Sequence, residues 1–95
     1  MYRDVQVVIW GAGSKGVTFL NLVRADDAVE YAVDVNPYKQ DKFVAGTGQE
    51  IGAPAFLRQY RPDYVILMND VYKAEIGQTL KSLGIRPEII LVQTQ

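Results

Sequence analysis

Three glycines that follow an apolar run have the clearest chemical potential in this sequence. Gly11, Gly13 and Gly16 come directly after Val5–Trp10 in a Gly-x-Gly-x-x-Gly spacing. In such a turn the first glycine allows a sharp bend, the second lets a ligand approach the backbone, and the third allows close helix–strand contact. Free amides at the start of the following helix, with the positive end of its dipole, would then face an anion such as a diphosphate.

Polar residues lie in and after this turn. Ser14 is a candidate cap for the helix, and Lys15 is either a phosphate contact or a lysine on the helix surface. Asp34 lies 18 residues after Gly16, where dinucleotide sites place a carboxylate that accepts hydrogen bonds from ribose hydroxyls. The alternative for Asp34 is a turn-forming role ahead of Asn36-Pro37. Its spacing from the glycines favours the ligand interpretation.

These residues need a strand, a helix and a second strand to position them. Val5–Trp10 is almost continuously apolar, which is typical of a strand covered on both faces in a parallel sheet. The apolar spacing predicts a helix from Ser14 to about Arg24, and Val29–Val35 reads as the second strand. Such a βαβ crossover is almost always right-handed and parallel.

The segment Asn36–Gly52 has no helical period and contains three glycines. It leaves the carboxyl end of the second strand, the edge where open α/β sheets bind ligands. Lys39, Lys42 and the turn at Gly46-Thr-Gly48 could meet phosphates there, although each lysine taken singly is more simply a solvated side chain. A short strand near Gln49–Ile51 is compatible with the pattern.

The second half of the chain alternates helix and strand. The predicted elements are a short helix, a buried strand, a longer helix and a last strand, at Ala55–Tyr60, Asp63–Met68, the segment from Tyr72 to Leu83, and Ile89–Val92. In the longer helix Tyr72, Ile76, Leu80 and Leu83 form one apolar stripe, so we expect Tyr72 in the core. Asn69 either caps this helix or faces a ligand.

The element order predicts one α/β domain over residues 1–95. We expect a Rossmann-like open parallel sheet of about four strands, in the order 2-1-3-4, with helices on both faces. The connections from strands one and three would leave in opposite directions. The crevice between them, with Gly11–Gly16 on one side and Asn69 on the other, is the expected ligand site.

Composition narrows the function. A hydrophobic content of 48% and a charged content of 22% are those of a soluble globular protein, and the net charge of −1 argues against nucleic acid as a partner. The chain has no cysteine and no histidine, which removes disulfides, the usual zinc sites and imidazole acid–base catalysis. Neither a secretion signal nor an apolar run of about 18 residues is present, so we expect a cytoplasmic protein without a membrane partner.

Two enzyme interpretations conflict with the residues. Methyltransferases that bind S-adenosylmethionine in a Rossmann-like domain tend to carry an acidic residue two positions before a Gly-x-Gly-x-Gly turn, whereas this chain has Ile9 there and Lys15 at the third glycine. The spacing permits NAD binding, but 95 residues leave no room for a second mononucleotide half or a catalytic domain. A complete hydride-transfer enzyme therefore does not fit.

Four segments carry a resemblance to a known family, namely Trp10–Asn21, Val33–Gln40, Gly46–Ile51 and Arg61–Asn69. Together they resemble the C-terminal domain of the sugar C-methyltransferase family, bacterial enzymes that methylate a carbon atom of nucleotide-linked deoxysugars. The resemblance runs from about Val7 to Val92. Its specific part is the Asp-x-Asn-Pro-Tyr-Lys-Gln segment that begins at Asp34.

The resemblance implies a three-part enzyme with a zinc-binding N-terminal part, a methyl-donor domain that holds S-adenosylmethionine and the catalytic histidine, and this C-terminal domain. The C-terminal domain would help to form the sugar-nucleotide site against the methyl-donor domain, and would hold no catalytic residue and no cofactor of its own. The expected substrate-binding residues are Gly11, Gly13, Ser14, Lys15, Gly16, Asp34, Asn36, Lys39 and Asn69. The alternative is a stand-alone, non-catalytic module that senses a nucleotide such as NAD or serves assembly.

Overall fold

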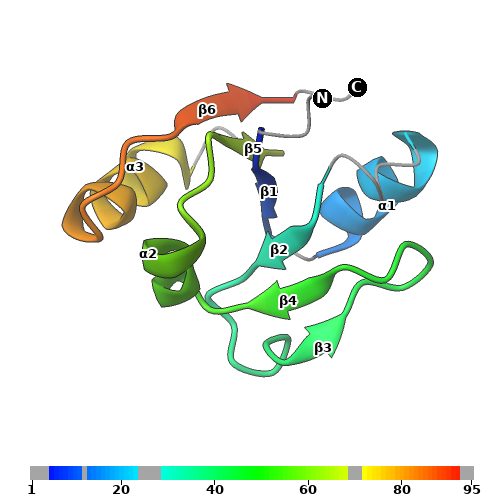
Figure 1. Ribbon diagram of the computed structural model, residues 1–95. Helices are drawn as coiled ribbons and strands as arrows, with labels where there is room; N and C mark the ends of the chain where they lie inside the picture. Colours follow the sequence, from blue (N-terminus) through cyan, green and yellow to red (C-terminus); the bar gives the residue numbers. More distant parts are fainter. Residues whose placement is uncertain (1–4, 12, 24–28, 69–71, 93–95) are drawn as a thin grey trace.

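The strand β1 (Val7–Trp10) lies in the middle of the sheet and has a parallel neighbour on each side. The computed structural model describes residues 5–11, 13–23, 29–68 and 72–92 (Figure 1). The elements after β1 are α1 (Ser14–Val23), β2 (Tyr31–Val33), β3 (Lys42–Phe43), β4 (Glu50–Gly52), the 3₁₀ turn η1 (Pro54–Phe56), α2 (Leu57–Tyr60), β5 (Tyr64–Leu67), α3 (Lys73–Ser82) and β6 (Glu88–Leu91).

The sheet has six strands in the order β3-β4-β2-β1-β5-β6. The four expected strands keep their relative order as β2-β1-β5-β6, but β4 and β3 extend the sheet beyond β2. The prediction of about four strands in the order 2-1-3-4 was therefore wrong in number and incomplete in order. The short strand that the sequence allowed near Gln49–Ile51 is present as β4, although it was left out of the expected sheet, whereas β3 was missed. The two strands are only three and two residues long, and Ile51 is their one buried residue, so they leave almost no hydrophobic pattern.

The segment between β2 and β4 is anchored by polar side chains. Gln49 is buried, and its side-chain amide donates to the Val29 carbonyl oxygen at 3.0 Å while its oxygen accepts from the Thr47 hydroxyl. From α1, the Asn21 side chain donates to the carbonyl oxygen of Ala45 at 3.0 Å. These bonds hold β3 and β4 as a hairpin next to α1.

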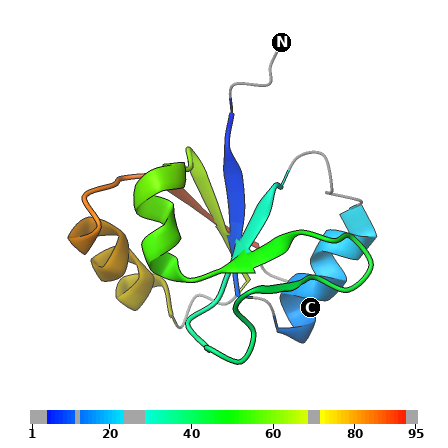
Figure 2. The ribbon, with the colours of Figure 1, turned by 60° about the horizontal axis from the view of Figure 1, so that its bottom comes forward.

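Alternation along the strands divides the core into two clusters. Val8 and Trp10 of β1 face a cluster completed by residues of α2, α3, β2 and β5, whereas Ile9 faces a cluster that includes Leu20 of α1. Figures 1 and 2 show α1 on one side of the sheet and α2 and α3 on the other. The expectation of helices on both faces is confirmed, and the sheet is mostly parallel.

The apolar stripe of α3 only partly enters the core. Ile76 and Leu80 are buried and Leu83 is half-buried, but Tyr72 is 52% exposed. The prediction that Tyr72 belongs to the core was wrong because this residue precedes the helix, at its N-cap, beyond the part of α3 that packs on the sheet. The tyrosine is therefore available at the surface.

An aromatic cluster fixes α2 against β2. The ring of Tyr31 lies 4.8 Å from that of Phe56 and 4.9 Å from that of Tyr60, centroid to centroid, both in edge-on geometry. The Tyr60 hydroxyl donates to a carboxylate oxygen of Glu30. Burial raises the pKa of the Tyr60 hydroxyl well above that of a free tyrosine, and the hydrogen bond to Glu30 and its negative charge raise it further.

No helix in the described ranges is both long enough and apolar enough to cross a membrane.

Candidate functional site

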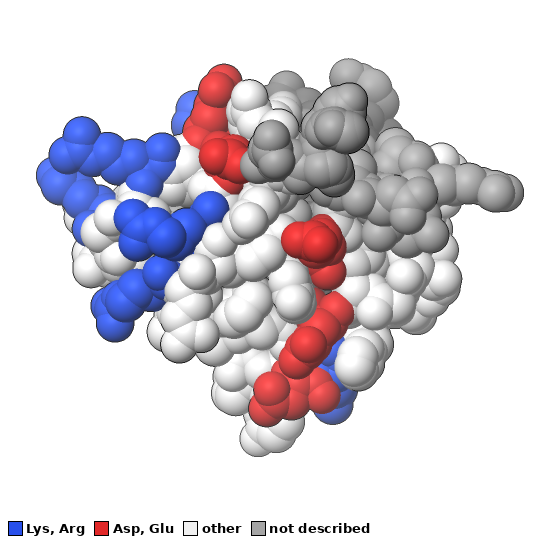
Figure 3. Space-filling view, viewed as in Figure 1, with Lys and Arg blue, Asp and Glu red and all other residues white. Residues whose placement is uncertain are grey.

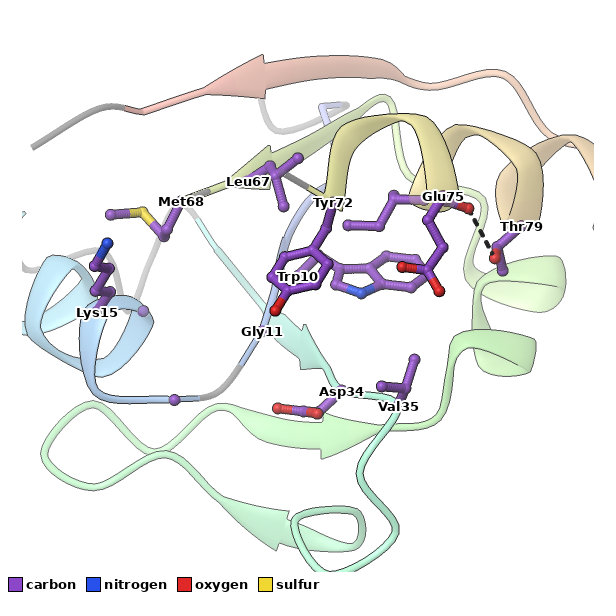
Figure 4. Close-up of a pocket in the computed structure, with 13 residues that line it drawn as sticks. Trp10, Gly11, Lys15, Asp34, Val35, Leu67, Met68, Tyr72, Glu75 and Thr79 are labelled. Atoms are coloured by element: carbon purple, nitrogen blue, oxygen red, sulfur yellow. Dashed lines mark hydrogen bonds between the residues drawn. The ribbon is translucent and has the colours of Figure 1, made fainter. Parts of the chain in front are cut away.

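A cleft of about 560 Å³ lies at the carboxyl ends of β1, β2 and β5 (Figure 4). It lies where the chain leaves β1 towards α1 on one face of the sheet and leaves β5 towards α3 on the other. This is the crevice that the sequence predicts as the ligand site. Its lining residues are Trp10, Gly11, Gly13, Lys15, Gly16, Asp34, Val35, Leu67, Met68, Tyr72, Glu75, Ile76 and Thr79.

The glycine turn forms one end of the cleft. Gly11 has a φ of +105°, a left-handed conformation that favours glycine, and its amide donates to the Val33 carbonyl oxygen at 2.6 Å. A Cβ atom on Gly16 would overlap the carbonyl oxygen of Gly11. A Cβ atom on Gly13 would meet no atom within 4 Å, so at this glycine the backbone is open to the cleft.

Lys15 reaches the cleft from the first turn of α1, on the opposite side from α3 (Figure 4). The amide of Val17 donates to the Gly13 carbonyl oxygen at 3.0 Å, which starts the helical hydrogen bonds directly behind the turn. Ser14 begins the helix, but its side chain lies outside the described part of the structure, as does the whole of Asn69.

Asp34 enters the cleft from the end of β2 and also shapes the turn after it. One carboxylate oxygen accepts the amide of Asn36 at 2.9 Å, and the backbone amide of Asp34 donates to the Gly52 carbonyl oxygen at 3.0 Å. Gln40 donates to the Asp34 carbonyl oxygen at 2.8 Å. Asp34 thus forms the turn, as one of the two interpretations predicts, and it lines the cleft in which the other interpretation would place a ligand.

Asn36 and Lys39 stand apart from the cleft. The Asn36 side-chain oxygen accepts the amide of Tyr38 at 2.9 Å, and its carbonyl oxygen accepts the amide of Lys39 at 3.0 Å. The specific segment of the family resemblance therefore forms a series of turns. The structure brings Gly11, Gly13, Lys15, Gly16 and Asp34 together and leaves Asn36 and Lys39 outside the cleft lining.

The far wall of the cleft holds residues that the sequence analysis did not single out as ligand contacts. Glu75 and Thr79 lie four residues apart on one face of α3, and Tyr72, the N-cap residue of that helix, lies three residues before Glu75. Trp10, the single tryptophan of the chain, closes the cleft from β1. The four-residue spacing of Glu75 and Thr79 could have indicated this wall from the sequence, because it places two polar side chains on one face of the helix, beside the apolar stripe.

The charges in the cleft are unequal at its two ends. Among the described lining residues, Lys15 is the one cation, while Asp34 and Glu75 bring carboxylates. Figure 3 shows a different face, on which most of the Lys and Arg side chains in view gather beside α2 and α3. Within the described ranges no group of three or more His, Cys, Asp or Glu side chains could hold a metal ion.

Comparison with protein families gives a direct result. The model of the C-methyltransferase C-terminal domain matches residues 2–90. The chain belongs to this family. The resemblance noted in the sequence is thereby confirmed for the C-methyltransferase C-terminal domain, while a comparison with curated proteins gives no match.

Solved structures resemble the C-methyltransferase C-terminal domain in fold. RSP, a Rex-family repressor, has a TM-score of 0.66 at 17% identity over 96% of this chain and 53% of its own. RSP in complex with β-NAD⁺ and operator DNA has a TM-score of 0.61 at 19% identity, over 96% of this chain and 51% of its own. UDP-D-quinovosamine 4-dehydrogenase from Vibrio fischeri has a TM-score of 0.65 at 21% identity, over 93% of this chain and 77% of its own. This chain thus spans about half the length of RSP, and the likeness places it among Rossmann-type folds.

Proposed function

We propose that this C-methyltransferase C-terminal domain binds a nucleotide-linked sugar in the cleft and presents it to a methyl-donor domain that uses S-adenosylmethionine. The observation that carries the proposal is the open backbone at Gly13, which faces the cleft beside the start of α1 and Lys15. Amides at a helix start bind phosphate groups well, and a lysine next to them adds a positive charge.

The position of Asp34 supports the proposal that the nucleoside lies on the β2 side of the phosphates. It lies at the carboxyl end of the strand next to β1 and lines the same cleft as Gly13. A carboxylate at this position can accept hydrogen bonds from the two ribose hydroxyls. The cleft therefore suits a ligand with a diphosphate near the glycines and a ribose near Asp34.

The methyl donor itself belongs elsewhere in this proposal. The residue two positions before the glycine turn is Ile9, which is fully buried in the cluster that includes Leu20 of α1 and offers the cleft no carboxylate. The chain also has no histidine to act as a base. Catalysis is thus assigned to the methyl-donor domain, and substrate binding to this one.

A nucleotide-sensing module is the second candidate function. The likeness to RSP, solved with β-NAD⁺ and with β-NADH, favours testing it. A sensor would use the same glycine turn, so the two functions differ in the ligand that binds and not in the place where it binds.

A titration distinguishes the candidates. The isotope-labelled protein is titrated with dTDP, a dTDP-sugar, NAD and S-adenosylmethionine while its amide cross-peaks are followed. We expect dTDP and the dTDP-sugar to move the amides of Gly11, Gly13, Gly16 and Asp34. Movement with NAD in preference to dTDP compounds would favour the sensor, and no movement with any of the four would contradict both functions.

A further inference from the structure

A second hollow, of about 420 Å³, lies at the end of β5 opposite to the cleft. Its lining comes from residues 61–63, which directly precede β5, and from residues 84–87, which directly precede β6. The hollow therefore lies at the amino ends of these two strands, whereas the cleft lies at the carboxyl end of β5. The two share no lining residue, so the hollow is a separate feature of the surface.

The same pair of residues enters the hollow from both stretches. Arg61-Pro62 stands before β5 and Arg86-Pro87 stands before β6. Because β5 and β6 are neighbouring parallel strands, both pairs come to the same end of the sheet. Two arginines that are 25 positions apart in the sequence thus line one hollow, which we call the arginine hollow.

Positive charge predominates in the arginine hollow. Arg61 and Arg86 are exposed, and within the described ranges neither guanidinium group has a hydrogen bond or an ion pair. Asp63 is the one carboxylate among the described lining residues, and one of its oxygens already accepts the backbone amide of Gln6 at 2.8 Å. Lys81 lines an adjoining hollow that shares Arg86 with this one, on the face where Figure 3 shows Lys and Arg side chains beside α2 and α3.

The backbone of Arg61 gives a second reason to assign a role to its side chain. Arg61 is the C-cap of α2 and has a φ of +55°, in the left-handed region where glycine is the usual residue. A side chain in this conformation costs free energy, and residues that keep such a cost are frequent at ligand sites. Within the described ranges no hydrogen bond or ion pair of the guanidinium group offsets that cost.

The chemistry of two converging arginines matches a phosphate group. Each guanidinium group is planar, stays charged, and can donate two parallel hydrogen bonds to phosphate oxygens. A phosphate monoester carries close to two negative charges at neutral pH, so two arginines balance it. The hollow has more room than a single phosphate ion needs, and Pro62, Ile85 and Pro87 offer apolar contact to an organic part.

We propose that the arginine hollow binds the phosphate group of a small phosphate ester, with Arg61 and Arg86 on the phosphate oxygens. The organic part of the ester lies against the two prolines and Ile85. This site does not depend on the proposed function of the cleft, because the two lie at opposite ends of β5 and have separate linings.

The test is a titration of the isotope-labelled protein with inorganic phosphate, glucose 1-phosphate and glucose. The amide of Gly84 and the Nε–H groups of Arg61 and Arg86 report on the hollow, and the amides of Gly11 and Gly13 report separately on the cleft. A site with a dissociation constant of about 1 mM is about 90% filled at about 10 mM ligand. Both phosphates should move the hollow's cross-peaks, glucose should not, and the ester should bind more tightly than inorganic phosphate.

Two variants test the arginines. Arg86→Gln should weaken glucose 1-phosphate binding at Gly84 by about tenfold or more, because a charged donor pair is lost. Arg61→Gly should weaken it equally while the protein stays as stable as the unmodified one or becomes more stable, since glycine adopts the positive φ without cost. Arg58→Gln is the matched control: Arg58 is exposed on α2, outside the hollow, and its loss should change affinity by about twofold or less.

Four results would overturn the inference. They are unmoved hollow cross-peaks with both phosphates, inorganic phosphate binding as tightly as the ester, retained affinity in Arg61→Gly or Arg86→Gln, and a loss in Arg58→Gln as large as in those two. A clearly destabilised Arg61→Gly protein would assign Arg61 to the fold and would also contradict the proposal. None of these results bears on the cleft, whose own reporters are Gly11 and Gly13.

Discussion

The carbonyl oxygen of Gly11 occupies the space that a side chain on Gly16 would need. The two residues belong to the same turn, five positions apart in the sequence, and the turn brings the start of α1 back over its first glycine. Gly16 is therefore required by the shape of the turn, whereas Gly13 leaves room for a ligand.

Gly16→Ala should destabilise the fold. The new methyl group would press on the Gly11 carbonyl oxygen, and relief would require the turn to shift, at a cost of about 1–3 kcal/mol in the free energy of unfolding. Chemical denaturation measures this change. Gly77→Ala is the control because a Cβ on Gly77, inside α3, meets nothing within 4 Å; it should be neutral or stabilising.

Gly13→Val should abolish ligand binding in a protein that remains folded. The valine side chain meets no protein atom near its Cβ but fills the approach to the backbone at the cleft. Amide shifts during a dTDP titration measure the loss. Gly77→Val, which adds the same side chain outside the cleft lining, should keep the affinity, and retained binding by a folded Gly13→Val protein would contradict a ligand at this turn.

Gln49→Leu should destabilise the protein by about 1–3 kcal/mol, because it removes the donor to the Val29 carbonyl oxygen and leaves that oxygen without this partner. The loss is measured by the midpoint and slope of urea denaturation. Gln78→Leu makes the same replacement at an exposed position of α3 and should change stability by far less. Equal stability of the two variants would show that the buried amide does not anchor the hairpin.

Stability should decline at high pH through Tyr60. Because burial and Glu30 raise the pKa of Tyr60 in the folded protein, its hydroxyl holds its proton more tightly there than in the unfolded chain. The stabilisation of the folded protein by this proton is complete below a pH of about 10, the ordinary pKa of tyrosine, and it is lost as the pH rises above that value. Thermal melts from pH 8 upward, at roughly half-unit steps, should show a steeper decline for the unmodified protein than for Tyr60→Phe.

Tyr38→Phe is the control for that series, because the Tyr38 ring is exposed and makes none of the aromatic contacts of Tyr60. Its decline with pH should follow that of the unmodified protein. An unchanged decline in Tyr60→Phe would show that this hydroxyl has no part in the pH dependence.

The sequence predicted the central part of the fold because its signals there are strong. The continuous apolar run to Trp10, the glycine spacing and the apolar period after Ser14 agree on β1, the turn and α1, and Asp34 lies at the cleft as its spacing indicates. Asn69, the other residue predicted to line the crevice, lies outside the described residues.

The rest depended on tertiary contacts that a one-dimensional pattern does not contain. The hairpin of β3 and β4 is held by Gln49 and Asn21, whose partners are distant backbone oxygens. Tyr72 has the spacing of a core residue, yet it precedes the helix and stays half exposed. Trp10 has the pattern of a buried strand residue, and only the structure identifies the ring edge that faces the cleft.

The bond from Asn21 to the Ala45 carbonyl oxygen ties the hairpin to the same helix whose first turn borders the cleft. A rigid displacement of that helix by a bound anion would carry residues 45–49 with it. Chemical-shift changes in the hairpin would then report indirectly that a ligand occupies the glycine turn. If every shifted residue were taken as a ligand contact, hairpin residues that do not touch the ligand would be assigned to its binding site.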